Sequence, residues 1–125
     1  MKEFAFLGKK VNAPSKQLDV FSCPENITLV KFECDELTSF CPVTNQPDFY
    51  KVVLEYSPDM LCIESKSLKL YYWSFREEAM FAEALADQIV SDVYKAVQPF
   101  WCKVTITQHV RGGLQLSAVA EKRRE

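Results

Sequence analysis

The segment around Cys41 carries the residues best suited to covalent chemistry in this chain of 125 residues. Pro42, Val43 and Thr44 follow the thiol, and Asp48 lies seven positions after it. A thiolate is a strong nucleophile, and a positioned carboxylic acid can protonate an atom on which negative charge develops. The residue types and their spacing therefore predict attack by Cys41 on an electrophilic carbon, with Asp48 as the acid.

Most of the other cysteines are expected to be small buried residues and not ligands of a metal site. The chain has five cysteines and contains no C-x-x-C pair. Zinc sites and disulfide frameworks usually show paired cysteines at characteristic spacings. We therefore expect no metal, and we expect free thiols in a reducing compartment.

Composition and charge favour one small globular domain without a nucleic-acid or membrane surface. Hydrophobic residues make up 48% of the chain, and the formal net charge is −2. The acidic balance argues against binding to nucleic acid through bulk electrostatics. No apolar run approaches the ~20 residues that a membrane-spanning helix needs, and the apolar stretch near the N-terminus is too short for a signal peptide. We expect a cytoplasmic protein.

Hydrophobic periodicity predicts two strands before any helix. Residues 26–36 and 49–57 alternate as strands do, and residues 37–48 form the intervening Cys41 loop. Residues 61–64 are a short extended piece. Residues 1–25 show weak periodicity and read as an irregular N-terminal arm.

Two helices and two further strands follow. A first helix, capped by Ser65 or Ser67, is expected to end near residue 74. The apolar spacing of three and four predicts a second helix over 77–97, stopped by Pro99. The remaining predicted elements are a strand over 101–110, a turn at 111–113 and a strand over 114–120.

This element order, ββααββ, predicts an α+β domain over 26–121 with a charged tail at 122–125. The sheet is antiparallel, and two helices cover one face. A four-stranded sheet leaves two open edges. Ring assembly, in which sheets of several subunits join into a barrel, would cover them, so we expect a homo-oligomer.

Three segments together resemble one enzyme family. The stretch Thr38–Phe49 resembles the catalytic loop of the NADPH-dependent 7-cyano-7-deazaguanine reductases, the nitrile reductases of queuosine biosynthesis. The run Glu64–Tyr71 matches the family signature at every position, and Arg111-Gly112-Gly113 matches its late turn. With Ser74-Phe75-Arg76 and Phe81-x-Glu83, the likeness spans roughly residues 34–120. It implies the tunnelling fold, in which subunits form barrel-like rings with active sites between them.

The resemblance also implies roles for individual residues. Cys41 would form a thioimide with the nitrile of 7-cyano-7-deazaguanine, and Asp48 would donate protons. Glu83 resembles the glutamate that anchors the purine-like ring, and a carboxylate can accept two hydrogen bonds from such an edge. The further positions implied to contact the substrate are Ile63, Glu64, Ser65 and Ala82.

The cofactor implied by the resemblance is NADPH. Lys66 and Lys69 lie three positions apart, so they share one helical face near a helix N-terminus that favours anions. Arg111 would add a forked contact to phosphate. The chain lacks a G-x-G-x-x-G segment after a strand, so a Rossmann cofactor site is not expected.

One position departs from the family pattern. The family commonly has His immediately before the anchoring Glu, where this chain has Ala82. The single histidine of the chain is His109, on the strand predicted over 101–110. The substitution leaves the source of one proton open.

Three alternatives remain beside the reductase. The first is an amidinotransferase-like relative that attacks the same nitrile in tRNA without NADPH. The second is another tunnelling-fold enzyme of the cyclohydrolase or pterin type, although those enzymes need zinc-ligating histidines and this chain has one His. The third is a binding module that has lost the chemistry.

Overall fold

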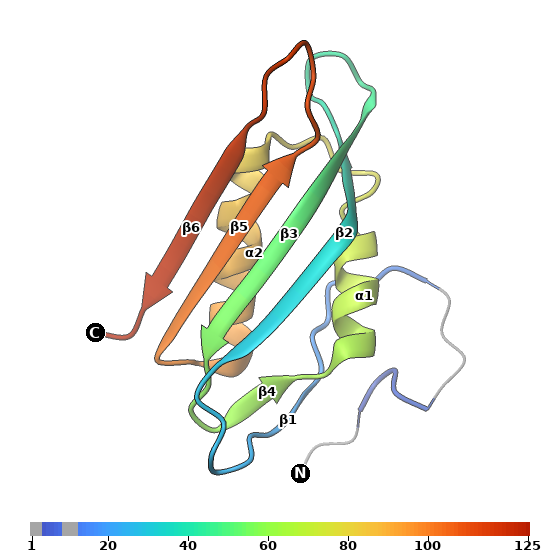
Figure 1. The fold of residues 1–125 in the computed structure, drawn as a ribbon. Helices are drawn as coiled ribbons and strands as arrows, with labels where there is room; N and C mark the ends of the chain where they lie inside the picture. Colours follow the sequence, from blue (N-terminus) through green and yellow to red (C-terminus); the bar gives the residue numbers. More distant parts are fainter. Residues whose placement is uncertain (1–3, 9–12) are drawn as a thin grey trace.

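Four antiparallel strands form the main sheet, and two helices pack on one of its faces (Figure 1). The computed structural model describes residues 4–8 and 13–125. The strand order is β2-β3-β5-β6, and a separate two-stranded sheet joins β1 to β4. The elements are β1 (Val20–Ser22), β2 (Val30–Phe40), β3 (Pro47–Ser57), β4 (Leu61–Ile63), α1 (Ser65–Trp73), α2 (Ala82–Val97), β5 (Trp101–Gln108) and β6 (Ser117–Arg123). The predicted α+β architecture is confirmed.

Strict alternation along β3 decides which side chains form the core. Tyr50, Val52 and Leu54 are fully buried beneath the helices, whereas the residues between them point to the opposite face. Asp48 lies two residues before Tyr50, so it shares the buried face. The strand therefore directs an acidic side chain into the interior at one end of the core.

The second helix supplies the other half of the core. Leu85, Ile89 and Val93 recur at four-residue spacing and are fully buried against β5 and β6. The helix ends where Gln98 adopts a left-handed conformation at φ 48° before Pro99. This packing fixes the position of the N-terminal end of α2.

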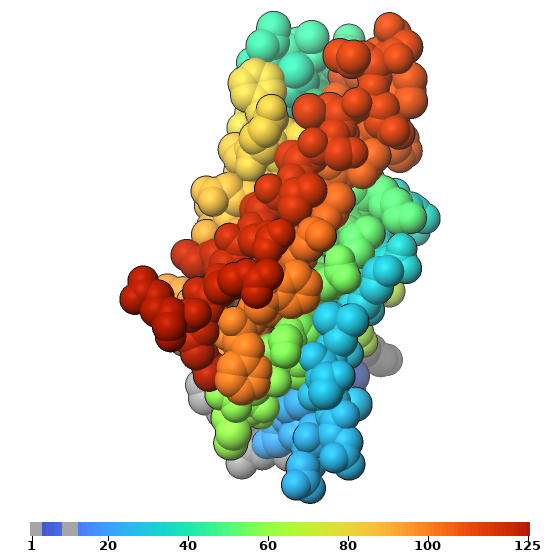
Figure 2. Space-filling model, turned by 60° about the vertical axis from the view of Figure 1, so that its left-hand side comes forward, coloured from blue at the N-terminus to red at the C-terminus, as the bar shows by residue number. Residues whose placement is uncertain are grey.

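The face of the sheet away from the helices is charged. Lys31, Glu55, Lys103 and Glu121 lie directly opposite one another across the four strands. Neighbouring opposite charges on a sheet stabilise the pairing modestly. Figure 2 shows these strands as diagonal bands, with β6 in red, β5 in orange, β3 in green and β2 in blue. The alternation thus gives the sheet one apolar face and one polar face.

The prediction of a loop over 37–48 was wrong. The second strand continues to Phe40 and the third begins at Pro47, so the loop contains only residues 41–46. A bulge between Cys34 and Leu37 shifts the register and reverses which side chains face inward. The extra residue disturbs the simple alternation from which the end of the strand was predicted.

Other boundaries also differ from expectation. The strand predicted over 26–36 begins at Val30, and the helix predicted over 77–97 begins at Ala82. The last strand, predicted over 114–120, runs from Ser117 to Arg123 and enters the predicted tail. In the described part of the N-terminal arm, β1 pairs with β4 in the register Val20↔Ile63.

Candidate functional site

Cys41 stands in a tight turn that supplies hydrogen-bond donors to its sulfur. The turn closes through Asn45 N donating to Cys41 O at 2.9 Å and Cys41 N donating to Gln46 O at 2.9 Å. Asn45 has a φ of 57°, a left-handed conformation that Asn tolerates. The Thr44 hydroxyl, together with the amides of Thr44 and Val43, lowers the pKa of the Cys41 thiol. Cys41 is partly exposed, and the lowered pKa favours the thiolate form of its sulfur.

The start of α2 is held beside this turn by a short parallel pairing. Phe40 N donates to Glu78 O at 2.8 Å, and Met80 N donates to Phe40 O at 3.0 Å. The pairing places the first turn of α2 next to the residue that precedes Cys41. It also explains the late start of the helix, because residues 78–80 form an isolated parallel bridge with Phe40.

Ala82 and Glu83 differ in burial at this helix N-terminus. Ala82 is 2% exposed and its methyl group belongs to the core, while Glu83 is exposed. Phe81 provides no side-chain cap, so the first amides of α2 remain available to an acceptor. The N-terminus of α2 thus presents an exposed carboxylate together with available amide donors.

Asp48 is buried in this same corner of the fold. Its carboxyl group is 4% exposed and forms an ion pair through Oδ1 with Arg111. The Tyr50 hydroxyl approaches Oδ2 at 3.4 Å. Arg111 also donates to Pro47 O at 3.1 Å, so it ties the loop after β5 to the hairpin that carries Asp48. Sequence analysis did not predict this pairing of Arg111, and its phosphate role stays a prediction.

Glu64 acts as the N-cap of α1, a position that we had predicted for Ser65 or Ser67. Its Oε2 accepts from Lys66 N and its Oε1 accepts from Ser67 N, both at 2.8 Å. The side chain is 6% exposed. The neighbouring Ile63 is buried and its N–H donates to the Tyr56 hydroxyl at 2.8 Å. Both oxygens of the Glu64 carboxylate are therefore engaged within the chain.

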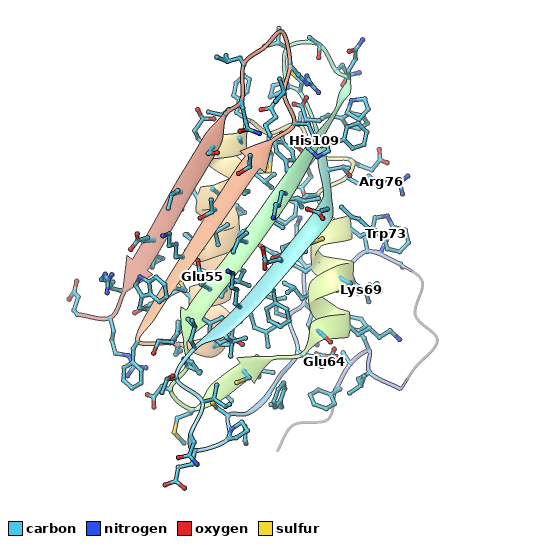
Figure 3. The ribbon with its side chains drawn as sticks, viewed as in Figure 1. Glu55, Glu64, Lys69, Trp73, Arg76 and His109 are labelled. Atoms are coloured by element: carbon cyan, nitrogen blue, oxygen red, sulfur yellow. The ribbon has the colours of Figure 1, made fainter. Side chains whose placement is uncertain are left out.

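The predicted substrate residues gather at two ends of the molecule. Glu64 caps α1 at the end near β4, whereas Trp73 is the last residue of that helix and Arg76 lies just beyond it (Figure 3). Cys41, Asp48 and Glu83 lie at the far end, where β2 meets residues 78–80. A single chain therefore does not bring all the predicted substrate contacts into one pocket.

A basic groove runs along α1 between these two ends. It has a volume of about 820 Å³ and reaches Phe40 and Pro47, the paired residues at the base of the Cys41 loop. Its charged lining residues are three cations, Lys66, Lys69 and Arg76, and two carboxylates, Glu36 and Glu77. Two predicted cofactor residues thus share one groove, and its cations exceed its carboxylates by one.

Two further groove residues were missed by sequence analysis. Trp73 and Arg76 project to the same side of the molecule as Lys69 (Figure 3). Their spacing in the sequence continues the three-four pattern that begins at Lys66. That periodicity was the available signal, although Arg76 lies just beyond the last residue of α1.

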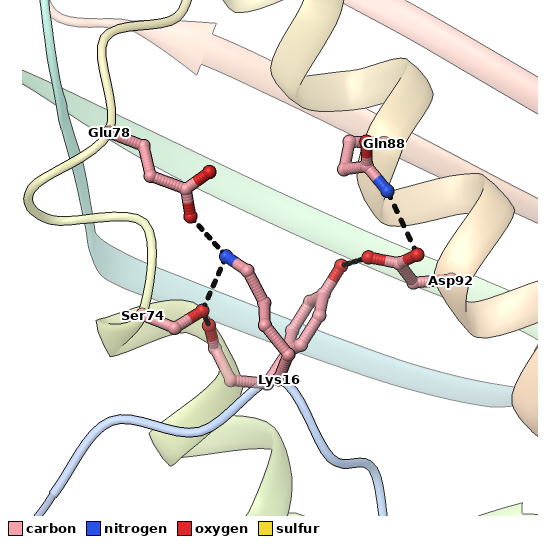
Figure 4. Close-up of polar contacts among 6 residues, drawn as sticks. Lys16, Ser74, Glu78, Gln88 and Asp92 are labelled. Atoms are coloured by element: carbon pink, nitrogen blue, oxygen red, sulfur yellow. Dashed lines mark hydrogen bonds and ion pairs between the residues drawn. The ribbon is translucent and has the colours of Figure 1, made fainter.

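The described part of the N-terminal arm fastens the segment between the helices. Lys16 Nζ donates to Ser74 Oγ at 2.7 Å and forms an ion pair with Glu78 (Figure 4). The ammonium group also lies 3.4 Å from the ring centroid of Phe75. These contacts support the residues that pair with Phe40, so the arm helps to place the start of α2.

His109 lies close to the hairpin that carries Asp48. The imidazole ring stacks on Phe49 with centroids 6.1 Å apart, and the backbone N–H of His109 donates to Phe49 O at 3.0 Å. Phe49 directly follows Asp48, but its side chain points to the other face of β3. The histidine therefore does not take the place that the family histidine would occupy at Ala82.

Residues 4–8 and 13–125 contain no cluster of His, Cys, Asp or Glu that could hold a metal ion. None of the helices in these ranges is long and apolar enough to cross a membrane.

Comparison with known proteins identifies the family. The family described as "QueF-like protein" matches residues 47–125. A protein of Alkalilimnicola ehrlichii named NADPH-dependent 7-cyano-7-deazaguanine reductase is 44% identical over 89% of this chain and 88% of its own length. A protein of the same name from Syntrophus aciditrophicus is 42% identical over 97% of this chain and 87% of its own.

A solved structure supports the same fold. The apo form of the archaeosine synthase QueF-Like superposes with a TM-score of 0.71 at 29% identity, covering 75% of this chain and 92% of that one. The likeness agrees with the predicted tunnelling fold. The chain belongs to the family of the NADPH-dependent 7-cyano-7-deazaguanine reductases.

Proposed function

We propose that this protein reduces the nitrile of 7-cyano-7-deazaguanine to an aminomethyl group in queuosine biosynthesis. The relatives at 42–44% identity carry the corresponding name. The observation that carries the proposal is the activated Cys41 turn at the end of the same hairpin that buries Asp48. A thiolate and an acid at the end of one hairpin match the two chemical needs of nitrile reduction.

The Cys41 thiolate opens the reaction. Its sulfur adds to the nitrile carbon, one C–N π bond breaks, and the nitrogen takes up a proton to give a thioimide. Thr44 and the backbone amides of the turn lower the pKa of the Cys41 thiol, which favours the thiolate needed for the attack. The C=N group of the thioimide accepts a hydride more readily than the nitrile does.

Asp48 is the proton donor in the steps that follow. NADPH, when bound, supplies one hydride to the thioimide carbon and a second to the imine carbon. After the first transfer the nitrogen takes up a second proton, the C–S bond breaks, the Cys41 thiolate leaves, and a protonated imine remains. The second hydride converts this protonated imine to the amine without a further proton. The balance is two hydrides and two protons for each nitrile.

The cofactor is proposed to bind in the groove along α1. Lys66, Lys69 and Arg76 place three cations on its wall, and Trp73 provides an aromatic surface. Lys66 Nζ also donates to Phe6 O at 3.1 Å, so the arm lies against this wall. Phosphate groups match such a cationic surface. Arg111 is proposed as a second phosphate contact where the groove approaches Pro47.

The substrate pocket is proposed to form between two subunits of a homo-oligomer. One subunit would supply Cys41, Asp48 and Glu83, and its neighbour would supply the residues around Glu64. The separation of these groups within one chain supports this arrangement. The open edge strands β2 and β6 offer a route to barrel-like rings. We place the enzyme in the cytoplasm, with no direct contact to nucleic acid or membrane.

An amidinotransferase-like activity is the second candidate. The superposition on an archaeosine synthase supports it, because that protein shares the fold. The basic groove and the higher identity to the reductases favour the first candidate.

NADPH consumption on addition of 7-cyano-7-deazaguanine tests the proposal. We expect two NADPH oxidised for each nitrile and no oxidation with Cys41→Ala. If the nitrile reacts with ammonia and no NADPH is oxidised, the amidinotransferase hypothesis replaces the reductase hypothesis. If the nitrile does not react under either condition, both candidates fail.

A further inference from the structure

A buried row of hydroxyl groups ends on the carboxyl group of Asp48. Tyr50 is fully buried, and its hydroxyl lies 3.4 Å from Asp48 Oδ2. Ser39 is also fully buried, and its hydroxyl donates to the Tyr50 oxygen at 3.1 Å. Ser39 lies directly opposite Asp48 in the register of β2 and β3. The three polar side chains therefore meet inside the apolar face of the sheet.

A hydroxyl at position 50 is not needed to fill the core. A phenylalanine would occupy nearly the same volume without a polar atom to satisfy. The partners recorded for the Tyr50 hydroxyl are Ser39 and Asp48. Burial raises the pKa of Tyr50, so the phenol keeps its proton and remains a donor. The Tyr50 hydroxyl therefore contributes hydrogen bonds to Ser39 and Asp48 and is not required for packing.

The two oxygens of Asp48 are distinguished by their surroundings. Oδ1 faces the guanidinium group of Arg111, whereas Oδ2 faces the Tyr50 hydroxyl. A proton on Oδ1 would be directed at a cation, so the proton that Asp48 transfers belongs on Oδ2. When that proton leaves, negative charge appears on the carboxylate beside the phenol O–H. A hydrogen bond to an ionised acceptor is stronger than one to a neutral acceptor.

We propose that Tyr50 is a positioning residue, which orients Oδ2 of Asp48 and stabilises the carboxylate formed when this acid protonates the substrate nitrogen. The inference rests on the proposed function. Ser39 holds the phenol and also approaches Met80 O at 3.5 Å, directly before α2. The hydroxyl row therefore connects the acid to the segment that carries Glu83.

Tyr50→Phe tests the proposal in the full-length protein. Loss of one preorganised donor to a developing negative charge slows catalysis by about 100- to 1,000-fold in other enzymes. We expect kcat to fall by about tenfold or more because the 3.4 Å contact is long. The KM for the nitrile and the amount of covalent Cys41 adduct formed without NADPH should stay within about twofold of the wild type, because Tyr50 acts after attack.

Tyr71→Phe is the matched control. It removes a phenol that donates to the Asp92 carboxylate at 2.6 Å between α1 and α2, and Tyr71 is also fully buried. We expect this variant to lose thermal stability and to keep its kcat. If Tyr71→Phe slows turnover as much as Tyr50→Phe does, the effect reflects general loosening of the core and the proposal is overturned.

A double-mutant cycle with Asp48→Asn separates an effect through Asp48 from an independent one. In single-turnover assays, Tyr50→Phe should slow the Asp48→Asn enzyme by less than about twofold, because the carboxylate it stabilises is absent. A full additive loss would overturn the proposal, as would unchanged kcat in Tyr50→Phe alone. A wild-type enzyme that oxidises no NADPH overturns the proposed function instead, and this inference falls with it.

Discussion

The cap at the start of α1 yields a stability prediction that can be worked from the structure. In Glu64→Ala, the amides of Lys66 and Ser67 lose the carboxylate oxygens that they contact at 2.8 Å. Loss of an N-cap costs about 1 kcal/mol. A buried amide left without an acceptor costs about 1–3 kcal/mol. Because Glu64 is 6% exposed, water replaces the carboxylate poorly, and we expect a total loss of about 2–4 kcal/mol.

Thermal unfolding at fixed protein concentration measures this loss. For a domain of this size, each 1 kcal/mol lowers the Tm by about 4 °C, so Glu64→Ala should unfold about 8–16 °C below the wild type. Glu83→Ala is the matched control, since that carboxylate lies in the first turn of α2 and is exposed. Its loss removes at most about 1 kcal/mol of favourable interaction with the helix dipole.

Equal Tm values for the two variants would refute this reasoning, since Glu64 would then contribute no more than an exposed carboxylate. The two variants should also differ in their effects on function. Glu83→Ala should weaken substrate binding strongly at nearly unchanged stability. Glu64→Ala should lower both stability and activity, because its carboxylate anchors the helix from which the groove lysines project.

Three further outcomes are expected. Thr44→Val removes the side-chain donor to the sulfur, so the pKa of Cys41 should rise and the pH profile of thiol alkylation should move to higher pH. Thr44→Ser, which keeps the hydroxyl, should have the wild-type profile. An unchanged profile in Thr44→Val would exclude a role for the hydroxyl. Lys69→Ala and Arg76→Ala should each raise the KM for NADPH by about tenfold, which corresponds to a loss of ~1.4 kcal/mol, and leave the KM for the nitrile unchanged. If the KM for the nitrile rises and the KM for NADPH does not, the cofactor does not bind in this groove. Leu85→Ala should cost about 2–5 kcal/mol in chemical denaturation, since the side chain is fully buried, and a loss below about 1 kcal/mol would contradict its place in the core.

Regular periodicity made much of the fold predictable from the sequence. The alternation in residues 49–57 and the three-four spacing in α2 identified the core-facing side chains, which the structure buries. Cys41 and Asp48 were expected to act together, and the hairpin indeed places them at the same end of β2 and β3. The local sequence pattern was sufficient where the alternation or the helical spacing is unbroken, as in β3, and it failed in β2, where a bulge interrupts the alternation.

Features that depend on distant residues were not predictable in this way. The start of α2 is set by pairing of residues 78–80 with Phe40, and the position of Arg111 is set by Asp48. Each contact joins segments separated by tens of residues, so helix periodicity or turn composition carries no sign of it. The role of Glu64 as the N-cap could have been predicted more easily, because this residue directly precedes α1. Serine was predicted instead because it is a more common N-cap residue.

The most direct test of the account is the intact mass of the protein after mixing with 7-cyano-7-deazaguanine in the absence of NADPH. Addition of the thiolate to the nitrile releases no atoms, so we expect a mass increase equal to one whole substrate molecule. Peptide mapping should place it on Cys41. Cys23→Ala, which changes another partly exposed thiol, should still form the adduct, whereas Cys41→Ala should not. An unchanged mass, or an adduct that survives Cys41→Ala, would contradict the account.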